Sequence, residues 1–290
     1  MDKLIIHNID RSFGRTRALR QATLEIPTGI FGLLGENGAG KTTLMRIIAT
    51  VLKPDAGEIT LGDIKWSKDS HKVRQILGYL PQEFGAFKNI TAEECLKYIA
   101  QLKGIKGSEE CLLQTERVLK EVNLFEARDR KVGGFSGGMK RRLGIAQALL
   151  KDPELIIVDE PTAGLDPAER IRFRNLLRQL GRNRIVILST HIVEDIEATC
   201  QSLAVIKNGT SVQFSSQQEL SAIAEGKVWT WKLSNADYNS LGKDVHVVSS
   251  KIHKEYVEAR IIAGVKPGPE AEETEPTIEE GYLVWNMEQE

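Results

Sequence analysis

The chain has 290 residues, of which 41% are hydrophobic and 27% charged, and its formal net charge is −1. These values are ordinary for a globular protein and argue against extensive disorder, and the length suits one full-sized domain plus a smaller one. The charge supplies no global positive field, so we expect no nucleic-acid partner.

The apolar runs are too short to span a membrane. Leu155–Val158 and Ile185–Leu188 are strand-sized, far below the ~20 residues that a spanning helix needs. Met1–Ile6 carries no signal-peptide pattern. The three cysteines form no CxxC pair, which is typical of buried free thiols in a reducing compartment. We therefore expect a cytosolic protein that contacts a membrane only through a partner.

The N-terminal segment predicts short strands and then one helix. Turn residues separate three β-branched or apolar runs at Leu4–Ile9, Ala22–Ile26 and Ile30–Leu34. A glycine loop follows at residues 35–40, and a helical pattern begins after it. The apolar face predicted for this helix consists of Leu44, Ile47, Ile48 and Val51.

The glycine loop matches the phosphate-binding P-loop pattern GxxxxGK[ST] between a predicted strand and a predicted helix. Its residues are Gly35, Glu36, Asn37, Gly38, Ala39, Gly40, Lys41, Thr42 and Thr43. Glycines let the backbone wrap around phosphate oxygens, and the helix start directs N–H groups at the anion. We expect Lys41 to reach the β and γ phosphates, Thr42 to bind Mg²⁺ and Thr43 to touch the α phosphate. A chance glycine turn is the alternative, which four fixed positions in this context disfavour.

Residues 85–150 are predicted to be mostly helical. Thr91–Glu94 has capping-box spacing, so a helix is expected to begin there. A second helical pattern runs from about Glu109 to Val122.

A second chemical motif stands at the end of a predicted buried strand, Leu155–Val158, where Asp159 and Glu160 follow. Asp159 is expected to hold Mg²⁺, directly or through water, and Glu160 to polarise the attacking water as a general base. The alternative is a pair of solvated carboxylates that caps the next helix. The P-loop earlier in the chain favours the nucleotide site.

Strands and helices alternate through the rest of this region. A helix is predicted to open at Asp166-Pro167, a strand at Ile185–Ser189, and a hairpin with its turn at Lys207–Thr210. This alternation predicts a mostly parallel sheet with helices packed on it.

The pattern changes near residue 226. Lys227–Leu233 and Tyr256–Ile262 alternate with period two, whereas residues 266–276 are rich in Pro and Glu and are expected to form an exposed loop. Trp229 and Trp231 fall on one face of the first strand, where core packing is favoured over a ligand platform. We expect one domain at residues 1–225 and a small α/β domain at residues 226–290.

The motif Phe135-Ser136-Gly137-Gly138-Met139 resembles the LSGGQ signature of the ATP-binding cassette (ABC) family, and it opens another predicted helix. Three further segments match family motifs in the family's order. They are the Q-loop Tyr79–Gln82, the D-loop Ala163–Pro167 and the H-loop Leu188–His191. The resemblance covers residues 1 to about 225.

The resemblance implies a P-loop NTPase of the ABC type. Its α/β fold would combine a mostly parallel sheet core with an antiparallel β subdomain, a helical subdomain at about residues 85–150 and a small C-terminal α/β accessory domain. The implied catalytic residues are Lys41, Gln82, Glu160 and His191. His191 would sense the γ phosphate, and Gln82 would be a hinge that senses metal and phosphate.

Further residues are implied to contact the nucleotide or the metal. The metal-binding set is Thr42, Gln82 and Asp159. Besides the P-loop, the ATP-binding set contains Phe13, Ser136, Gly137, Gly138 and Asp166. Phe13 replaces the usual adenine-stacking tyrosine of the family, and a phenyl ring still offers a π face.

Met139 replaces the last glutamine of the signature, so its contact with the partner's nucleotide stays open. Together with Lys140–Leu143, it resembles single-cassette ATPases of simple exporters. Glu275–Glu280 resembles the end of the accessory domain common in that subgroup. The resemblance thus implies an ATP- and Mg²⁺-dependent exporter ATPase.

The expected assembly is a homodimer or heterodimer of cassettes, with Ser136, Gly137 and Gly138 acting in trans. It would be peripheral to the cytoplasmic side of the cell membrane through a separate integral membrane subunit. Phe84 and Phe87 are expected either to receive a cytoplasmic helix of that subunit or to pack in the helical subdomain.

Other functions remain as alternatives. An uptake system, or a mechanical or sensory membrane complex, would use the same motifs, and the transported substrate stays open. DNA-repair cassettes carry long coiled coils that this sequence lacks, and translation factors of this type carry two cassettes.

Overall fold

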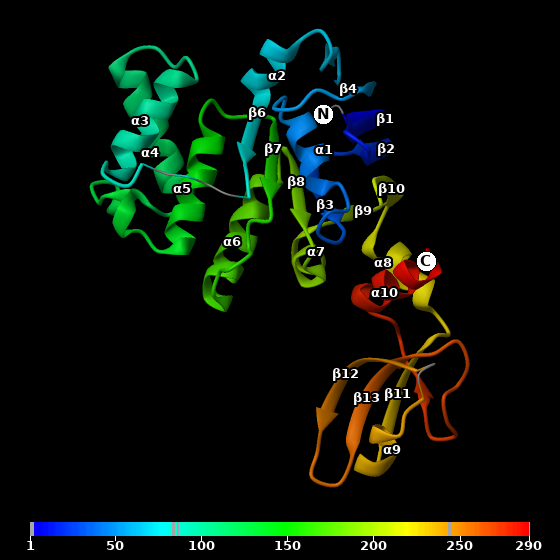
Figure 1. Cartoon of the computed structure of the whole chain (residues 1–290). Helices are drawn as coiled ribbons and strands as arrows, with labels where there is room; N and C mark the ends of the chain where they lie inside the picture. The colour runs from blue at the N-terminus through cyan, green and yellow to red at the C-terminus, as the bar shows by residue number, and fades with distance from the viewer. Residues whose placement is uncertain (1–2, 83–84, 86, 243–244, 290) are drawn as a thin grey trace. The chain divides into compact units, whose positions relative to one another are not determined.

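The computed structural model describes residues 3–82, 85, 87–242 and 245–289 (Figure 1). The chain divides into two compact units, Met1–Gln213 and Phe214–Glu290. This division lies before the expected boundary at residues 225/226. The reason is that helix α8 (Gln217–Ser221) and the 3-10 turn η3 (Ala222–Ala224) pack on the last helix of the chain.

A six-stranded sheet, ordered β10-β9-β3-β8-β7-β6, forms the centre of the first unit. The strands are β3 (Gly29–Leu34), β6 (Leu77–Leu80), β7 (Leu155–Asp159), β8 (Ile185–Thr190), β9 (Ser202–Lys207) and β10 (Thr210–Phe214). The pairs β3–β8, β3–β9, β7–β8 and β6–β7 are parallel, which confirms the predicted sheet. Since parallel strands end at one edge, the segments after β3, β7 and β8 meet there.

A second, antiparallel sheet has the order β2-β1-β4-β5. Its strands are β1 (Leu4–Phe13), β2 (Thr16–Ile26), β4 (Ala56–Leu61) and β5 (Ile64–Lys65). The first two strands extend beyond their predicted ends because the hairpin between them continues through mostly polar, solvent-facing residues that give no apolar alternation. This sheet is the antiparallel β subdomain that was expected.

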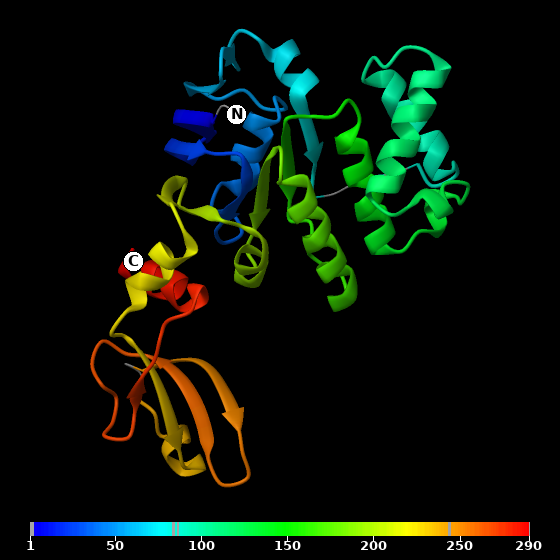
Figure 2. The ribbon, with the colours of Figure 1, turned by 180° about the vertical axis from the view of Figure 1, so that it is seen from behind.

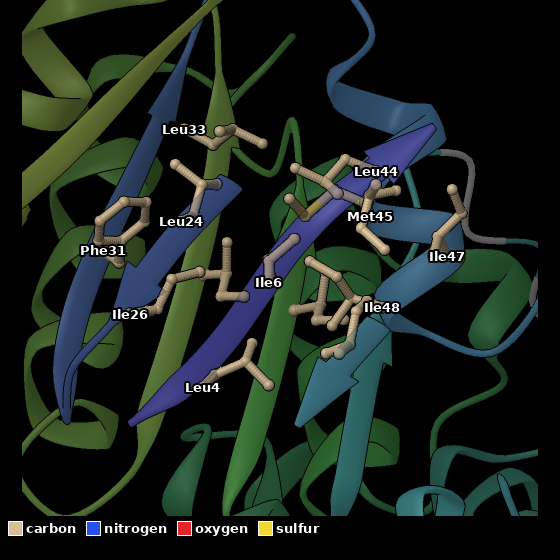
Figure 3. Packing of buried hydrophobic residues seen from close by; sticks show 14 of the residues in the cluster. Leu4, Ile6, Leu24, Ile26, Phe31, Leu33, Leu44, Met45, Ile47 and Ile48 are labelled. Carbon is tan, nitrogen blue, oxygen red and sulfur yellow. The ribbon is translucent and has the colours of Figure 1, made fainter. Parts of the chain in front are cut away.

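The main core lies between the two sheets and helix α1 (Lys41–Ile48). Figure 3 shows Leu24 of β2 near Phe31 and Leu33 of β3, and Ile6 of β1 between Leu24 and helix α1, all within one buried cluster. Val51, predicted on the same face of α1, is 66% exposed, so that prediction is wrong. The helix ends at Ile48, and Thr50 adopts a left-handed backbone with φ of 60°, which turns the chain away.

Three helices form the predicted helical subdomain and pack on one another, as both overall views show (Figures 1 and 2). They are α3 (Ala92–Leu102), α4 (Ser108–Glu121) and α5 (Gly137–Leu149), with the 3-10 turns η1 (Phe125–Ala127) and η2 (Val132–Gly134) between them. The predicted capping box at the start of α3 is confirmed: Glu94 N–H donates to Thr91 Oγ1 at 3.1 Å, and Thr91 N–H donates to Glu94 at 2.8 Å.

The remaining helices of the first unit are α2 (Ser70–Ile76), α6 (Pro167–Leu180) and α7 (Val193–Thr199). Asp166 caps α6 by accepting from Glu169 N–H at 2.9 Å, as its position before Pro167 predicted. Across the described ranges 3–82, 85, 87–242 and 245–289, no helix combines the length and the apolar character needed to cross a membrane.

The second unit contains a four-stranded antiparallel sheet, ordered β12-β13-β11-β14. Its elements are β11 (Val228–Leu233), α9 (Asn235–Asn239), β12 (His246–Ile252), β13 (Val257–Ile262), β14 (Glu272–Glu273) and α10 (Ile278–Glu288). The prediction of a wholly exposed loop at residues 266–276 is wrong in part, because β14 pairs with β11 and Ala271 is buried. Trp229 and Trp231 are partly buried against an apolar cluster that includes Ile261, as core packing predicted.

Close packing of α10 on α8 requires a glycine at position 281, because a Cβ there would overlap the main-chain carbonyl oxygen of Leu220. Gly281→Ala is therefore expected to destabilise the second unit by about 1–3 kcal/mol. Urea unfolding followed by tryptophan fluorescence measures this loss. Gly264→Ala, at an exposed glycine with no heavy atom near the added methyl, is the matched control. Equal midpoints for the two variants would contradict the packing argument.

Candidate functional site

The loop after β3 surrounds a cavity of about 330 Å³ at the carboxyl edge of the central sheet. It is lined by Ala18, Glu36, Asn37, Gly38, Gly40, Lys41, Thr42, Thr43, Gln82 and Glu160. Gly40 precedes α1 with φ of 117°, and a Cβ there would approach the carbonyl oxygen of Ala18. Glycine therefore lets the loop turn into the helix, whose first N–H groups face an anion-sized space.

Lys41 lies inside this loop and is only 5% exposed. Its Nζ donates to the carbonyl oxygens of Gly35 at 2.6 Å and Glu36 at 3.1 Å, and it lies 3.4 Å from Glu160 Oε1. The loop thus holds one buried cation beside the end of β7.

Asp159 ends β7 and is fully buried. Neither of its carboxylate oxygens has a hydrogen-bond partner within the described ranges. Burial raises the pKa of Asp159, while the nearby hydroxyls of Ser189 and Thr42 act in the opposite direction. A buried carboxylate without a partner is costly, so this position favours a bound cation.

Glu160 and His191 lie next to each other at the ends of β7 and β8. The distance from His191 Nδ1 to Glu160 Oε2 is 2.8 Å, and Glu160 is nearly buried while His191 is 44% exposed. Because a carboxylate can only accept, this contact assigns the proton to Nδ1 and leaves Nε2 of a neutral ring as an acceptor. The pair can therefore orient a polar group in front of the loop.

Gln82 also lines the cavity, with an exposed side chain. The single chain thus gathers the P-loop, Gln82 and the residues that end β7 and β8. Ala18 of β2 lines the cavity as well, but a small apolar residue in a strand gave no sequence signal.

Other residues expected at the nucleotide do not line this cavity. Phe13 is 48% exposed near the end of β1, with the Arg11 guanidinium 4.9 Å above its ring.

Ser136 caps α5 by accepting from Met139 N–H at 3.2 Å, and Gly137 and Gly138 form the first turn of that helix. Asp166 caps α6. None of these residues is among the described residues that line the P-loop cavity. Phe84 lies outside the described residues.

Comparisons with known proteins agree with this geometry. The sequence pattern of the family described as ABC transporter matches residues 19–163. The ABC transporter ATP-binding protein NatA of Bacillus subtilis (strain 168) is 40% identical over 196 residues, which cover 67% of this chain and 79% of NatA. The linearmycin resistance ATP-binding protein LnrL of the same organism is 35% identical, and the match covers 73% of this chain and 69% of LnrL.

Solved structures show the same fold. A dimeric structure of MJ0796, a bacterial ABC transporter cassette, has a TM-score of 0.64 and 25% identity, and the match covers 72% of this chain and 98% of that one. A post-hydrolysis state of the same cassette, bound to ADP and Pi, has a TM-score of 0.63. Because the family pattern matches residues 19–163 and relatives 40% and 35% identical cover 67% and 73% of its length, the chain belongs to the ABC transporter family as an ATP-binding protein.

Proposed function

We propose that the chain hydrolyses ATP as a dimer and drives a conformational change in a separate membrane subunit of an exporter. The main support for this proposal is the position of Glu160 at the P-loop cavity. Glu160 Oε2 lies 2.8 Å from His191 Nδ1, and Glu160 Oε1 lies 3.4 Å from Lys41 Nζ. A carboxylate in this position can take a proton from a water that attacks the γ phosphate.

The P-loop residues would bind the phosphates. Lys41 is held by two carbonyl oxygens and one carboxylate, and exchanging these for the β and γ phosphates gives its charge a stronger partner. The first N–H groups of α1, with Thr43, would contact the other phosphate oxygens. His191 would then orient the γ phosphate while Glu160 activates the water.

The residues present fit Mg²⁺, because the two buried oxygens of Asp159 have no hydrogen-bond partner among the described residues and Thr42 lies close enough to affect the pKa of Asp159. Thr42 and Asp159, with Gln82, would hold the ion. When bound, the ion neutralises charge on the phosphates. Oxygen ligands of this kind suit Mg²⁺.

A second copy of the chain would complete the site. Ser136, Gly137 and Gly138 are not among the described residues that line the P-loop cavity, and the helix that they open can donate N–H groups to the γ phosphate of the partner. The dimeric cassette among the similar structures supports this arrangement. Asp166 would lie at the same interface, and the exposed ring of Phe13 would stack on adenine.

The name of one relative supports export as the direction of transport, and an exposed aromatic pair supports contact with a membrane subunit. LnrL is named for resistance to linearmycin, which fits removal of a compound from the cell. Phe87 is 55% exposed and packs edge-on against Tyr98, with 5.7 Å between ring centroids. This pair would receive a cytoplasmic helix of the membrane subunit and hold the chain at the cytoplasmic face of the membrane.

Glu160→Gln keeps the size of the side chain and removes the base. We expect ATP binding to persist while hydrolysis falls by about 10²-fold or more, so that an ATP-bound dimer accumulates. Phosphate release and size-exclusion chromatography with Mg²⁺-ATP measure both effects. Glu154→Gln, at the exposed residue before β7, is the control and should behave as wild type. Rapid turnover by Glu160→Gln would remove this residue from the catalytic role.

The tagged chain, purified from detergent-solubilised native membranes, should retain a multi-helix membrane protein in stoichiometric amount, identified by mass spectrometry. Phe87→Ala should lower that recovery several-fold, since exposed aromatic anchors dominate many interfaces. Ile171→Ala, at an equally exposed residue on α6, is the control.

Recovery of ribosomes or nucleic acid in place of a membrane protein would contradict the transporter proposal. Equal recovery by Phe87→Ala and wild type would contradict only the proposed contact.

A further inference from the structure

Arg141 connects three catalytic segments through main-chain atoms. It lies on α5, five residues after Ser136. Its Nη1 donates to the carbonyl oxygens of Gln82 at 2.6 Å and Pro81 at 3.4 Å, and its Nη2 donates to the carbonyl oxygen of Glu160 at 3.3 Å. One guanidinium therefore joins the helix opened by Ser136 to the segment that ends in Gln82 and to the end of β7.

The main chain of Glu160 needs such support. Its φ is 47°, in the left-handed region that a non-glycine residue rarely adopts. Hydrogen bonds hold the main chain on both sides of this residue: Glu160 N–H donates to Ser189 O on β8 at 2.9 Å, and the Glu160 carbonyl oxygen accepts from Arg141. The direction of the Glu160 carboxylate, and thus its contact with His191, depends on that conformation.

The charge of Arg141 suits this position. Its side chain is partly buried, and burial lowers the pKa of its guanidinium, whereas Asp159 and Glu160 act to raise it. An arginine stays protonated under these conditions, and its planar fork donates to several acceptors at once. The point charge of a lysine ammonium lacks this fixed geometry, so the bridge between both segments requires arginine.

We propose that Arg141 is a positioning residue that holds Glu160 and the Gln82 segment in register with the helix that begins at Ser136. The first turn of α5 engages the partner's nucleotide. A movement of α5 at that step would change the position of Glu160, the general base, through the side chain of Arg141. This inference rests on the proposed hydrolysis of ATP at the same site and adds a residue that touches neither ATP nor the attacking water.

The test measures kcat and KM for Mg²⁺-ATP in the full chain with Arg141→Gln and Arg141→Lys. Arg117→Gln is the matched control, because Arg117 Nη2 also donates to a main-chain carbonyl, that of Leu149, at 2.9 Å, away from the cavity. We expect Arg141→Gln to lower kcat about tenfold or more, with KM changed less than about twofold. Arg141→Lys should recover part of the loss, and Arg117→Gln should keep the wild-type kcat.

Thermal unfolding separates positioning from loss of fold. We expect Arg141→Gln and Arg117→Gln to lower the melting temperature by similar amounts, while only Arg141→Gln lowers kcat. This result would support the inference. A wild-type kcat for Arg141→Gln, with Glu160→Gln inactive, would overturn it and leave the proposed function intact. No hydrolysis by the wild-type chain itself would instead overturn the proposed function.

Discussion

The register of the parallel strands β3, β7 and β8 determines where the P-loop, Asp159, Glu160 and His191 lie. Leu34 of β3 pairs with Thr190 of β8, and Asp159 of β7 pairs with Ser189 of β8. The chain leaves each strand just beyond these pairs, so the P-loop, Glu160 and His191 emerge side by side. A shift of one residue in the β7–β8 pairing would turn Asp159 to the other face of the sheet, because successive side chains in a strand alternate.

Buried charged groups at the site can still bind a ligand. Lys41, Asp159 and Glu160 are all buried: Lys41 contacts two carbonyl oxygens and Glu160, whereas neither carboxylate oxygen of Asp159 has a hydrogen-bond partner among the described residues. Two buried carboxylates beside one ammonium are costly without further partners. A phosphate with its counter-ion would match both needs, since the anion pairs with Lys41 and the cation with Asp159.

Much of the fold could be predicted because local and global signals agree. The glycines and Lys41 mark a strand-to-helix turn, Thr91 with Glu94 marks a helix start, and the apolar run that ends at Asp159 marks a buried strand. Other features gave no local signal. The short strand β14 exists only because β11 pairs with it, and α2, β4 and β5 are amphipathic or polar segments placed by tertiary contacts.

Within the site, side chains with their own chemistry were predictable, whereas residues acting through position were not. Ala18 lines the cavity only because β2 passes beside Gly40, and Arg141 becomes informative only when its carbonyl partners are known. The boundary between the two units differs from the predicted one for a similar reason. Helix α8 packs on α10, and no turn or change in composition reveals this packing.

In the proposed dimer, the P-loop of one chain works with α5, the helix capped by Ser136, of the other chain. Mixing two inactive variants, Lys41→Ala and Gly137→Arg, tests it directly by ATP hydrolysis. Each variant alone disables every site of its own dimer, but a mixed dimer contains one site with an intact P-loop and an intact signature. The proposed dimer predicts that mixing restores hydrolysis. A mixture that stays as inactive as its components, although the two chains are shown to associate, would contradict it.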